Sequence, residues 1–487
     1  NRLKREGLHS AHIGISIQDD DKAQRGAVPV LHECWQALET AERRGIFSLC
    51  EGSYLADRES HPLALPPHQV VSILRRKWRG ARQFGLIRLS IEDVPAETFE
   101  EFEFDKTVAG TLPEGVSFTS VSSREGYILA PDLPAEKILS LGKRIKKKVE
   151  SEHKTVSVAL GVSHWPLLNY TKTQSVVNCI KALMHGRFFG SGSVTVFDHV
   201  SLNVSGDYFF DEGDYRQAVR DYRTGVLLAP DDINLLNSLG VALTALNRLR
   251  EAVVYFDRVL AIDSGDFMAL VNMGFAHRIL GNEDKAIRCF EKASRHTEFA
   301  DSPVFDELSL QLARLYCDKE IYDSALELLK RLDRSQNGRQ GYSLFLLQGE
   351  ACAGIGQHKE AVSFLQKAVR INPHDPHALS LLGELYALDE QGDEIALSLC
   401  QKAVSIDDAS WKHWYRLALV QLRMGRLEEA REAVQESLRI NRKAVEALSL
   451  AEQIYMQLGV LSKARSMHNR LLKIARTDHK AVKAMLN

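Results

Sequence analysis

Polar side chains recur at related positions in the second half of the chain, and their types suit them to bind a peptide. Asparagine can bond both the N–H and the C=O of an extended backbone, and arginine can form paired hydrogen bonds with a carboxylate. The simpler alternative is that some of these side chains are only solvated, and their mixed chemistry names no ligand. Counted from a small residue that recurs along the chain, the candidates are Asn234, Asn237, Asn272, Arg278, Gln311, Arg314, Glu384, Tyr415 and Arg416.

Two basic runs and one acidic run could also carry chemistry. The basic runs are residues 143–148 (KRIKKK) and 75–79 (RRKWR), and the acidic run is 97–105 (ETFEEFEFD). The first interpretation of the basic runs is a solvated helix face and a charged linker. The alternative is the docking of an acidic partner or a phosphate, since clustered cations raise the local concentration of anions. The acidic run could simply be neutralised by a nearby basic helix.

Metal and cofactor chemistry is disfavoured by the motifs. The 17 histidines are scattered, without a His-Glu-x-x-His motif or a Cys/His ligand spacing. Neither a phosphate-binding G-x-x-x-x-G-K-[ST] loop nor a G-x-S-x-G nucleophile motif is present. The sequence therefore predicts no metal, no cofactor and no catalytic residue.

The elements that position the candidate side chains follow from an internal repeat. Successive alanines of the repeat are separated by 34, 34, 39, 36, 35, 34 and 34 residues. A fixed period of this length is typical of stacked helix pairs. A second small residue precedes most of these alanines by 12 positions, and it allows two helices to approach closely. The alanines are Ala218, Ala252, Ala286, Ala325, Ala361, Ala396, Ala430 and Ala464, and the preceding small residues are Gly206, Gly240, Gly274, Ala313, Gly349 and Ala418.

Bulky residues lie between the small ones at helical spacing and are expected to fill the space between repeats. They are Tyr222, Phe256, Phe290 and Phe364. This pattern resembles a tetratricopeptide repeat array of about eight units, from about Leu202 to about Ala475. The resemblance implies an α-solenoid whose first helices line a concave, protein-binding surface. Glu452 replaces the small residue in the last unit and suggests an atypical terminal repeat.

Composition bounds the remaining possibilities. The formal charge of −2 argues against a nucleic-acid-binding surface over the whole molecule. Seven cysteines without a Cys-x-x-Cys pair suggest reduced thiols in a cytoplasmic protein. We expect no membrane span, because no apolar run approaches roughly 18–20 residues. The chain starts at Asn1 without a methionine, so a missing natural N-terminus is expected.

The first two hundred residues have a different pattern, in which β-rich runs alternate with helices. Helices are expected at 134–152 and 172–185, and strands at 86–93, 115–121, 126–131, 155–163 and 193–198. The predicted fold class is thus an α/β part followed by an all-α solenoid.

A weaker internal repeat lies in this α/β part. Ile13 to Ser16 (IGIS) parallels Leu160 to Ser163 (LGVS), and the helical run from Cys34 parallels that from Cys179. Two related α/β units in tandem are therefore predicted, the first represented by its C-terminal half only. The predicted divisions are 1–57 for the partial unit, 58–83 for a linker or helix, 84–200 for the complete unit, 201–475 for the repeats and 476–487 for a C-terminal tail or capping helix.

The order and spacing of these strands and helices over about 110 residues resemble a bacterial GGDEF (diguanylate cyclase) domain. On that resemblance, Ser122, Ser123, Arg124, Glu125 and Gly126 stand where the family has Gly-Gly-Asp-Glu-Phe. The resemblance then puts a cation, Arg124, where a metal-binding carboxylate belongs. It also puts Ser90 at the place of the metal-binding aspartate of the first core strand. The family's inhibitory product-binding R-x-x-D motif is absent as well.

Phosphoryl transfer depends on positioned metal ions, so the loss of both carboxylates predicts a degenerate, non-enzymatic domain. The sequence thus predicts an interaction scaffold in bacterial cytoplasmic signalling or motility. A protein segment would bind the repeats, and the α/β part would dock a second partner or form a homodimer. The alternative is a receptor for cyclic di-GMP or GTP, and an active diguanylate cyclase is the least favoured hypothesis.

Overall fold

The computed structural model describes residues 13–15, 27–44, 49–51, 63–92, 104–152, 156–300, 302–334, 341–388 and 392–475. The chain divides into two compact units, Asn1–Asn282 (unit 1) and Glu283–Asn487 (unit 2), and each is described by itself. The division falls inside the helical repeats, whereas the sequence predicted a boundary near residue 200. The predicted tail at 476–487 lies outside the described residues.

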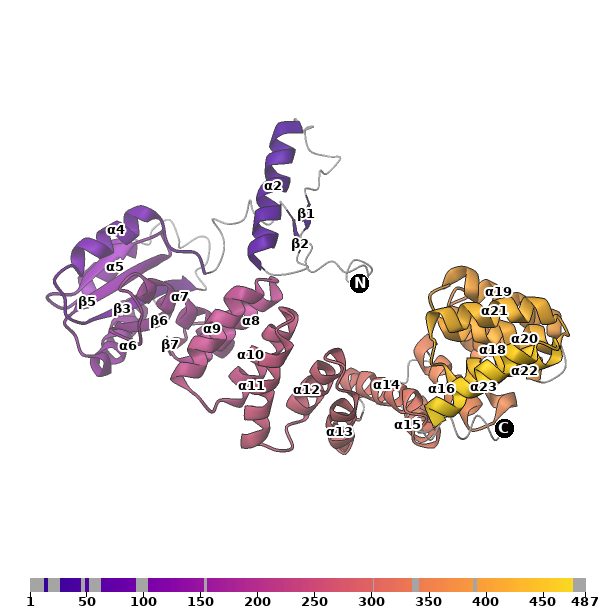
Figure 1. Ribbon diagram of the computed structural model, residues 1–487. Helices are drawn as coiled ribbons and strands as arrows, with labels where there is room; N and C mark the ends of the chain where they lie inside the picture. Colours follow the sequence, from indigo (N-terminus) through magenta and orange to yellow (C-terminus); the bar gives the residue numbers. More distant parts are fainter. Residues whose placement is uncertain are drawn as a thin grey trace. The chain divides into compact units, whose positions relative to one another are not determined.

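The α/β part of unit 1 contains a five-stranded sheet in the order β4-β5-β3-β6-β7 (Figure 1). β3 pairs antiparallel with both β5 and β6, and β6 pairs parallel with β7. Each of the five predicted strands overlaps an observed one, and the two predicted helices correspond to α6 and α7. The bounds are α4 His68–Lys77, β3 Phe84–Glu92, α5 Phe104–Thr111, β4 Ser117–Ser120, β5 Glu125–Pro131, α6 Ala135–Glu152, β6 Ser157–Trp165, α7 Gln174–Gly186, the 3-10 turn η3 Arg187–Phe189 and β7 Val194–Val196.

Helices cover both faces of this sheet because successive strand residues point to opposite sides. On β3, Ile87 and Leu89 join a core with residues of α6, whereas Phe84 and Leu86 join a second core with residues of α4 and α7. Gly161 on β6 is required by the second packing, since a Cβ there would lie 2.1 Å from the carbonyl oxygen of Cys179 on α7. The result is a sheet between two helical layers.

The stretch 58–83, predicted as a linker or helix, contains a packed helix. Residues 68–77 form α4, whose Val70 and Leu74 are buried against the sheet. Trp78, inside the basic run, is 4% exposed and stacks on Phe84 with ring centroids 5.2 Å apart. This basic run therefore ends a packed helix and is no charged linker.

The segment predicted as a partial α/β unit contains β1 (Ile13–Ile15), α2 (Ala27–Arg44) and β2 (Leu49–Glu51). β1 and β2 pair in parallel with Ile13 opposite Leu49, as β6 and β7 pair with Leu160 opposite Val194. In both segments the paired residue of the second strand lies 15 positions after the helical cysteine (49 − 34 and 194 − 179). Both segments thus have the same arrangement of a strand, a helix and a second strand parallel to the first. The domain division itself stays a prediction.

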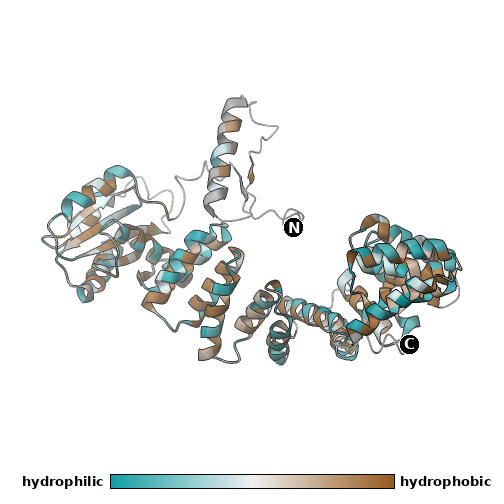
Figure 2. Cartoon of the chain, in the orientation of Figure 1, coloured by the Kyte–Doolittle hydropathy of each residue, from teal (hydrophilic) through white to brown (hydrophobic). Residues whose placement is uncertain are grey.

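The described residues of 199–475 form sixteen helices that alternate along the sequence as first and second helices of eight repeats, with α12 and α13 of the third repeat in different units. The first helix begins at His199, slightly before the predicted start. In Figure 2 most of these helices carry both apolar and polar segments, as expected of helices with one buried face. Unit 1 holds α8 His199–Asp211, α9 Tyr215–Leu228, α10 Ile233–Ala245, α11 Leu249–Ile262 and α12 Phe267–Ile279. Unit 2 holds α13 Glu283–Ala293, the turn η4 Thr297–Phe299, α14 Pro303–Asp318, α15 Tyr322–Arg334, α16 Tyr342–Gly354, α17 His358–Ile371, α18 Pro376–Leu388, α19 Asp393–Ile406, α20 Trp411–Arg423, α21 Leu427–Ile440, α22 Val445–Gln457 and α23 Leu461–Ala475.

The eight predicted alanines all lie on second helices and are at most 2% exposed. A Cβ on Gly240 would lie 2.4 Å from the ring of Phe256, so the small residue makes room for the bulky one. At the equivalent place in the fifth pair the structure corrects one prediction. Leu365 is fully buried and faces Gly349, whereas Phe364 is only partly buried.

The turns inside the helix pairs share one backbone conformation. A residue with positive φ lies in each turn, two positions after the first helix in all but the sixth, and glycine adopts this conformation without the steric penalty of a Cβ. Asn247 (φ 59°) and Glu320 (φ 61°) take this place in the second and fourth pairs. The glycines at the other turns are Gly213, Gly281, Gly356, Gly392, Gly425 and Gly459.

A buried polar junction explains why unit 1 extends past residue 200. Lys181 on α7 lies 2.5 Å from Asp221 on α9, and both side chains are at most 10% exposed. The hydroxyl of Ser205 on α8 also donates to Asp221, at 2.6 Å. An apolar cluster of Ala182, Phe197 and Leu202 lies in the same part of the unit. The last helix of the α/β part and the first helix pair are therefore packed as one body.

In the part of the chain that the structure describes, no helix combines the length and the apolar character needed to cross a membrane. The structure describes the side chains of six of the seven cysteines. All but Cys34 are buried.

Candidate functional site

The nine predicted groove residues are divided between the two units. Asn234, Asn237, Asn272 and Arg278 lie on first helices α10 and α12 of unit 1. Gln311, Arg314, Glu384, Tyr415 and Arg416 lie on first helices α14, α18 and α20 of unit 2. Their role in binding stays a prediction.

In unit 1 the candidate asparagines differ in exposure. Asn234 is exposed, whereas Asn237 and Asn272 are half-buried. The Nδ2 of Asn237 donates to Oδ1 of Asp266 at 3.2 Å, and the same oxygen caps α12 by accepting from the backbone N–H of Ala269. Asn237 thus joins two successive repeats, and its unpaired Oδ1 is the atom left for a further donor.

In unit 2 the structure brings three of the predicted residues together. The Nε of Arg416 lies 2.8 Å from a carboxylate oxygen of Glu384, and its Nη1 donates to the hydroxyl of Ser380 at 3.0 Å. Burial raises the pKa of Tyr415, and the nearby carboxylates of Glu384 and Glu446 raise it further. Arg416 is 9% exposed, and its charge is paired with that of Glu384. Arg314, by contrast, is exposed, and Gln311 donates to Glu307 of its own helix at 2.6 Å.

Further charged residues lie on the same first helices and were not among the predicted ones. Glu350 on α16 lies 3.5 Å from His377 on α18. Burial alone would raise the pKa of Glu350, but the hydrogen bond and charge of His377, together with Lys412, lower it. Partial desolvation of the Asp318 carboxylate on α14 and the neighbouring Glu350 raise its pKa, although the residue as a whole is exposed. The signal that could have found these residues is their place on first helices; Asp318 lies one turn after Arg314, whereas α16 carries no predicted residue.

His413 on α20 is a neutral member of this surface. Burial lowers its pKa to about 4, and the charges of Arg416 and His377 act in the same direction. Its Nδ1 shares a hydrogen bond of 2.9 Å with the hydroxyl of Ser380. The imidazole is therefore uncharged near neutral pH. The hydroxyl of Ser380 also accepts a hydrogen bond from Arg416.

The described residues offer recognition chemistry more readily than catalysis. Burial raises the pKa of the Cys400 thiol to about 12 and raises that of Cys317 as well, so neither is an activated nucleophile. No group of three or more potential metal ligands occurs among the residues that the structure describes. The first helices of unit 2 instead carry charges of both signs, which suits the binding of a polar segment.

The positions of the predicted degenerate signature lie at one end of the sheet. Ser90 on β3 is opposite Glu125 on β5, and Ser122, Ser123 and Arg124 form the turn before β5. Glu125 forms an ion pair with Arg88, whose guanidinium lies 4.7 Å from the ring centroid of Tyr127. The carboxylate of Glu125 is therefore already paired within the protein.

Comparison with known families agrees with the helix-pair geometry. Residues 204–267 and 310–376 match one family model described as tetratricopeptide repeat, and residues 269–295 and 413–443 match another with the same description. The chain contains tetratricopeptide repeats. All four matched ranges lie within the helix pairs, and the predicted solenoid class is thereby confirmed.

Curated relatives match over the repeats at low identity. Superkiller complex protein 3 of Mus musculus is 26% identical over 212 residues, which is 43% of this chain and 13% of that protein. TPR repeat-containing protein YpiA of Bacillus subtilis is 25% identical over 231 residues, covering 47% of this chain and 52% of that protein. Anaphase-promoting complex subunit 3 of Schizosaccharomyces pombe is 23% identical over 268 residues, 53% of this chain and 38% of that protein. The chain thus spans about half or less of the length of these relatives.

Two solved structures also match part of the chain. A tetratricopeptide repeat protein from Parabacteroides merdae is 16% identical, with a TM-score of 0.37, and the match covers 53% of this chain and 98% of that one. The MamA protein is 22% identical, with a TM-score of 0.29, and the match covers 36% of this chain and 92% of that one.

Proposed function

We propose that the chain is a non-catalytic scaffold whose repeats bind a segment of a partner protein. The observation that carries the proposal is the mixed-charge surface of unit 2, formed by first helices α14, α16, α18 and α20. Stacked repeats of this class create extended surfaces that bind proteins.

The exposed charges of this surface determine the kind of partner it fits. Arg314 and Lys412 are exposed cations, and Asp318 is an exposed carboxylate that interacts with both. Glu384 and Arg416 lie between helices and satisfy each other, so they stabilise the surface. A segment that carries both acidic and basic side chains would complement the three exposed residues.

For the α/β part we propose a degenerate GGDEF-like domain that docks a second partner or forms a homodimer. The pairing of Glu125 with Arg88 and the serine at position 90 support a role without metal-dependent chemistry. The setting in bacterial cytoplasmic signalling or motility rests on the family resemblance alone.

Peptide selection tests the scaffold function. Peptides are selected from a displayed random library on the full chain, and their affinities are measured by fluorescence anisotropy. Replacing Arg314 and Lys412 by alanine is expected to weaken binding about tenfold, because two charge-assisted contacts are lost. The matched control replaces Lys285 and Arg288, which are exposed on second helix α13. Equal loss in both variants, or none in either, would contradict the proposal.

Unit 1 provides a second arm of the same experiment. Peptides that require the first helices of unit 1 should lose affinity on Asn237→Ala with Asn272→Ala and keep it on Asn282→Ala.

The receptor alternative is tested by calorimetric titration with cyclic di-GMP, and then with GTP and magnesium. The scaffold account expects no heat of binding, and micromolar binding would make the α/β part a sensor.

A further inference from the structure

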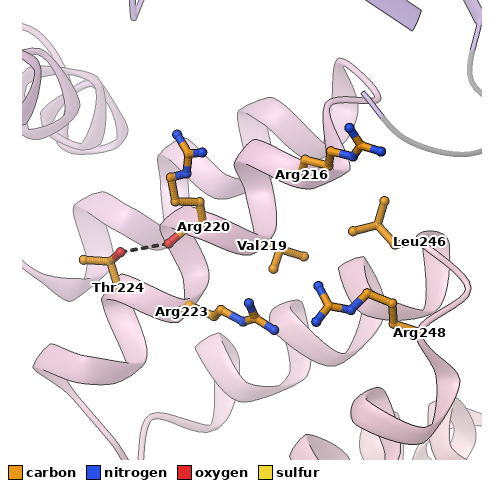
Figure 3. Close-up of a pocket in the computed structure, with 7 residues that line it drawn as sticks. All are labelled: Arg216, Val219, Arg220, Arg223, Thr224, Leu246 and Arg248. Carbon is orange, nitrogen blue, oxygen red and sulfur yellow. Dashed lines mark hydrogen bonds between the residues drawn. The ribbon is translucent and has the colours of Figure 1, made fainter. Parts of the chain in front are cut away.

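In unit 1, second helix α9 and the turn between α10 and α11 line a hollow of about 580 Å³ that is rich in arginine. Three of its arginines, Arg216, Arg220 and Arg223, come from α9, and Arg248 precedes α11. Spacings of four and three residues place the α9 arginines on one helix face. The complete lining is Arg216, Val219, Arg220, Arg223, Thr224, Leu246 and Arg248, here called the arginine hollow (Figure 3).

Two of the four guanidinium groups are held by one carboxylate. Glu251 forms an ion pair with Arg223 and another with Arg248, the latter at 2.5 Å. Figure 3 shows Arg223 and Arg248 extending toward each other, with Arg216 and Arg220 on the other side of Val219. The shared carboxylate fixes these two cations side by side without neutralising both.

The other two guanidinium groups belong to exposed residues of α9. Arg216 and Arg220 are exposed, and their side chains form no hydrogen bond or ion pair with any residue the structure describes. The hydroxyl of Thr224 donates to the backbone carbonyl of Arg220 at 2.8 Å and leaves that guanidinium unoccupied. Four guanidinium groups against one carboxylate leave a local excess of positive charge, which an incoming anion would relieve.

We propose that the arginine hollow binds an acidic protein segment whose charge comes from clustered carboxylates or from a phosphorylated side chain. All four cations are arginine, whose planar guanidinium binds carboxylate and phosphate oxygens in pairs. Val219 and Leu246 add apolar surface for the carbon atoms of the bound segment. Recognition of acidic and phosphorylated segments by arginine clusters is a general mode of peptide binding.

This site is separate from the surface of the proposed function. The hollow is lined by second helix α9 and the turn after α10, whereas the groove predicted from the sequence lies on first helices. If the first-helix groove bound no partner, the arginine hollow could still bind an acidic segment. The two proposals therefore fail independently.

Anisotropy titrations with three labelled peptides test the site on the full chain. The first peptide carries consecutive glutamates, the second replaces them by glutamines, and the third is the glutamine peptide with one phosphoserine. Arg216→Gln with Arg220→Gln should weaken binding of a charged peptide about tenfold, since two charge-assisted contacts are lost. Both arginines are exposed, so this variant should fold normally.

The control variant, Arg187→Gln with Arg288→Gln, removes the same charge from exposed positions outside the hollow. It should change affinity less than about twofold, because exposed charges more than about 10 Å away are screened at 0.1 M salt. Binding of the glutamate peptide identifies carboxylates as the charge source, and binding of the phosphoserine peptide alone identifies phosphate. The proposal is overturned if the glutamine peptide binds as well as both charged ones, if neither charged peptide binds, or if both variants lose affinity equally.

Discussion

Two sets of cations in this protein have opposite surroundings. Lys181 in unit 1 and Arg416 in unit 2 are at most 9% exposed, and each is paired with a carboxylate. Arg216 and Arg220 are exposed and without a described partner. A buried cation must be paired because its lost hydration is costly, whereas an exposed one can remain available to a ligand. Burial therefore separates the charges that hold the helices together from those that can recognise another molecule.

The largest loss of stability is expected when the junction of the α/β part and the first repeat is changed. Lys181→Met leaves the Asp221 carboxylate buried without its cation, which should cost about 3 kcal/mol or more. Hydrogen exchange of the α7 and α9 amides would show this as a lower opening free energy. The double variant Lys181→Met with Asp221→Leu should recover much of the loss. A single variant as stable as the parent would show that this ion pair does not hold the junction.

A slightly smaller effect is expected for the pair in unit 2, because the side chain of Glu384 is 20% exposed. Arg416→Met should lower the opening free energy of the α18 and α20 amides by about 2 kcal/mol. It should leave exchange in α7 and α9 unchanged. Exchange that quickens equally in both units would mean that the substitution acts on the whole chain and not on its own pair.

The neutral histidine of the same surface predicts a pH dependence. The pKa of His413 is about 4 when folded and near 6.5 as a model value. The folded state therefore binds the proton less readily than the unfolded state does. The contribution of His413 to the free energy of unfolding is full above about pH 6.5 and falls as the pH decreases toward 4. The loss is about 1.4 kcal/mol for each pH unit in that window. Thermal unfolding midpoints measured from pH 7 to 4 should fall less steeply in His413→Gln, and an unchanged slope would exclude this residue as the cause.

The smallest effect on stability is expected at the arginine hollow. Arg216→Gln with Arg220→Gln removes two exposed charges without described partners, so unfolding should change by less than about 0.5 kcal/mol. Relief of like-charge repulsion would make any change stabilising. The measurement is the calorimetric unfolding midpoint beside that of Arg187→Gln with Arg288→Gln. A large loss of stability would place these arginines in the packing of the repeats.

The helix pairs could be predicted because their signals are local and repeated. The eight alanines all occupy the same buried place on second helices. The pattern is interrupted where a turn changes length. A longer turn before α19 moves the small residue of the sixth pair to Gly383, where a Cβ would lie 2.7 Å from the sulfur of Cys400.

Pairings between distant residues could not be predicted from one sequence. Lys181 and Asp221 are 40 positions apart, and no pattern connects them. Glu384 and Arg416 were each predicted to face a ligand, but they lie 2.8 Å from each other. The spacing of a helix indicates which face a residue occupies, whereas its partner depends on the packing of the next helix.

Hydrogen exchange with and without a selected peptide would test the scaffold account most directly. The account predicts slower exchange in first helices α14, α16, α18 and α20, with second helices α15, α17 and α19 unchanged. Protection confined to the second helices, or to strands β3 and β5, would contradict binding along the first-helix surface.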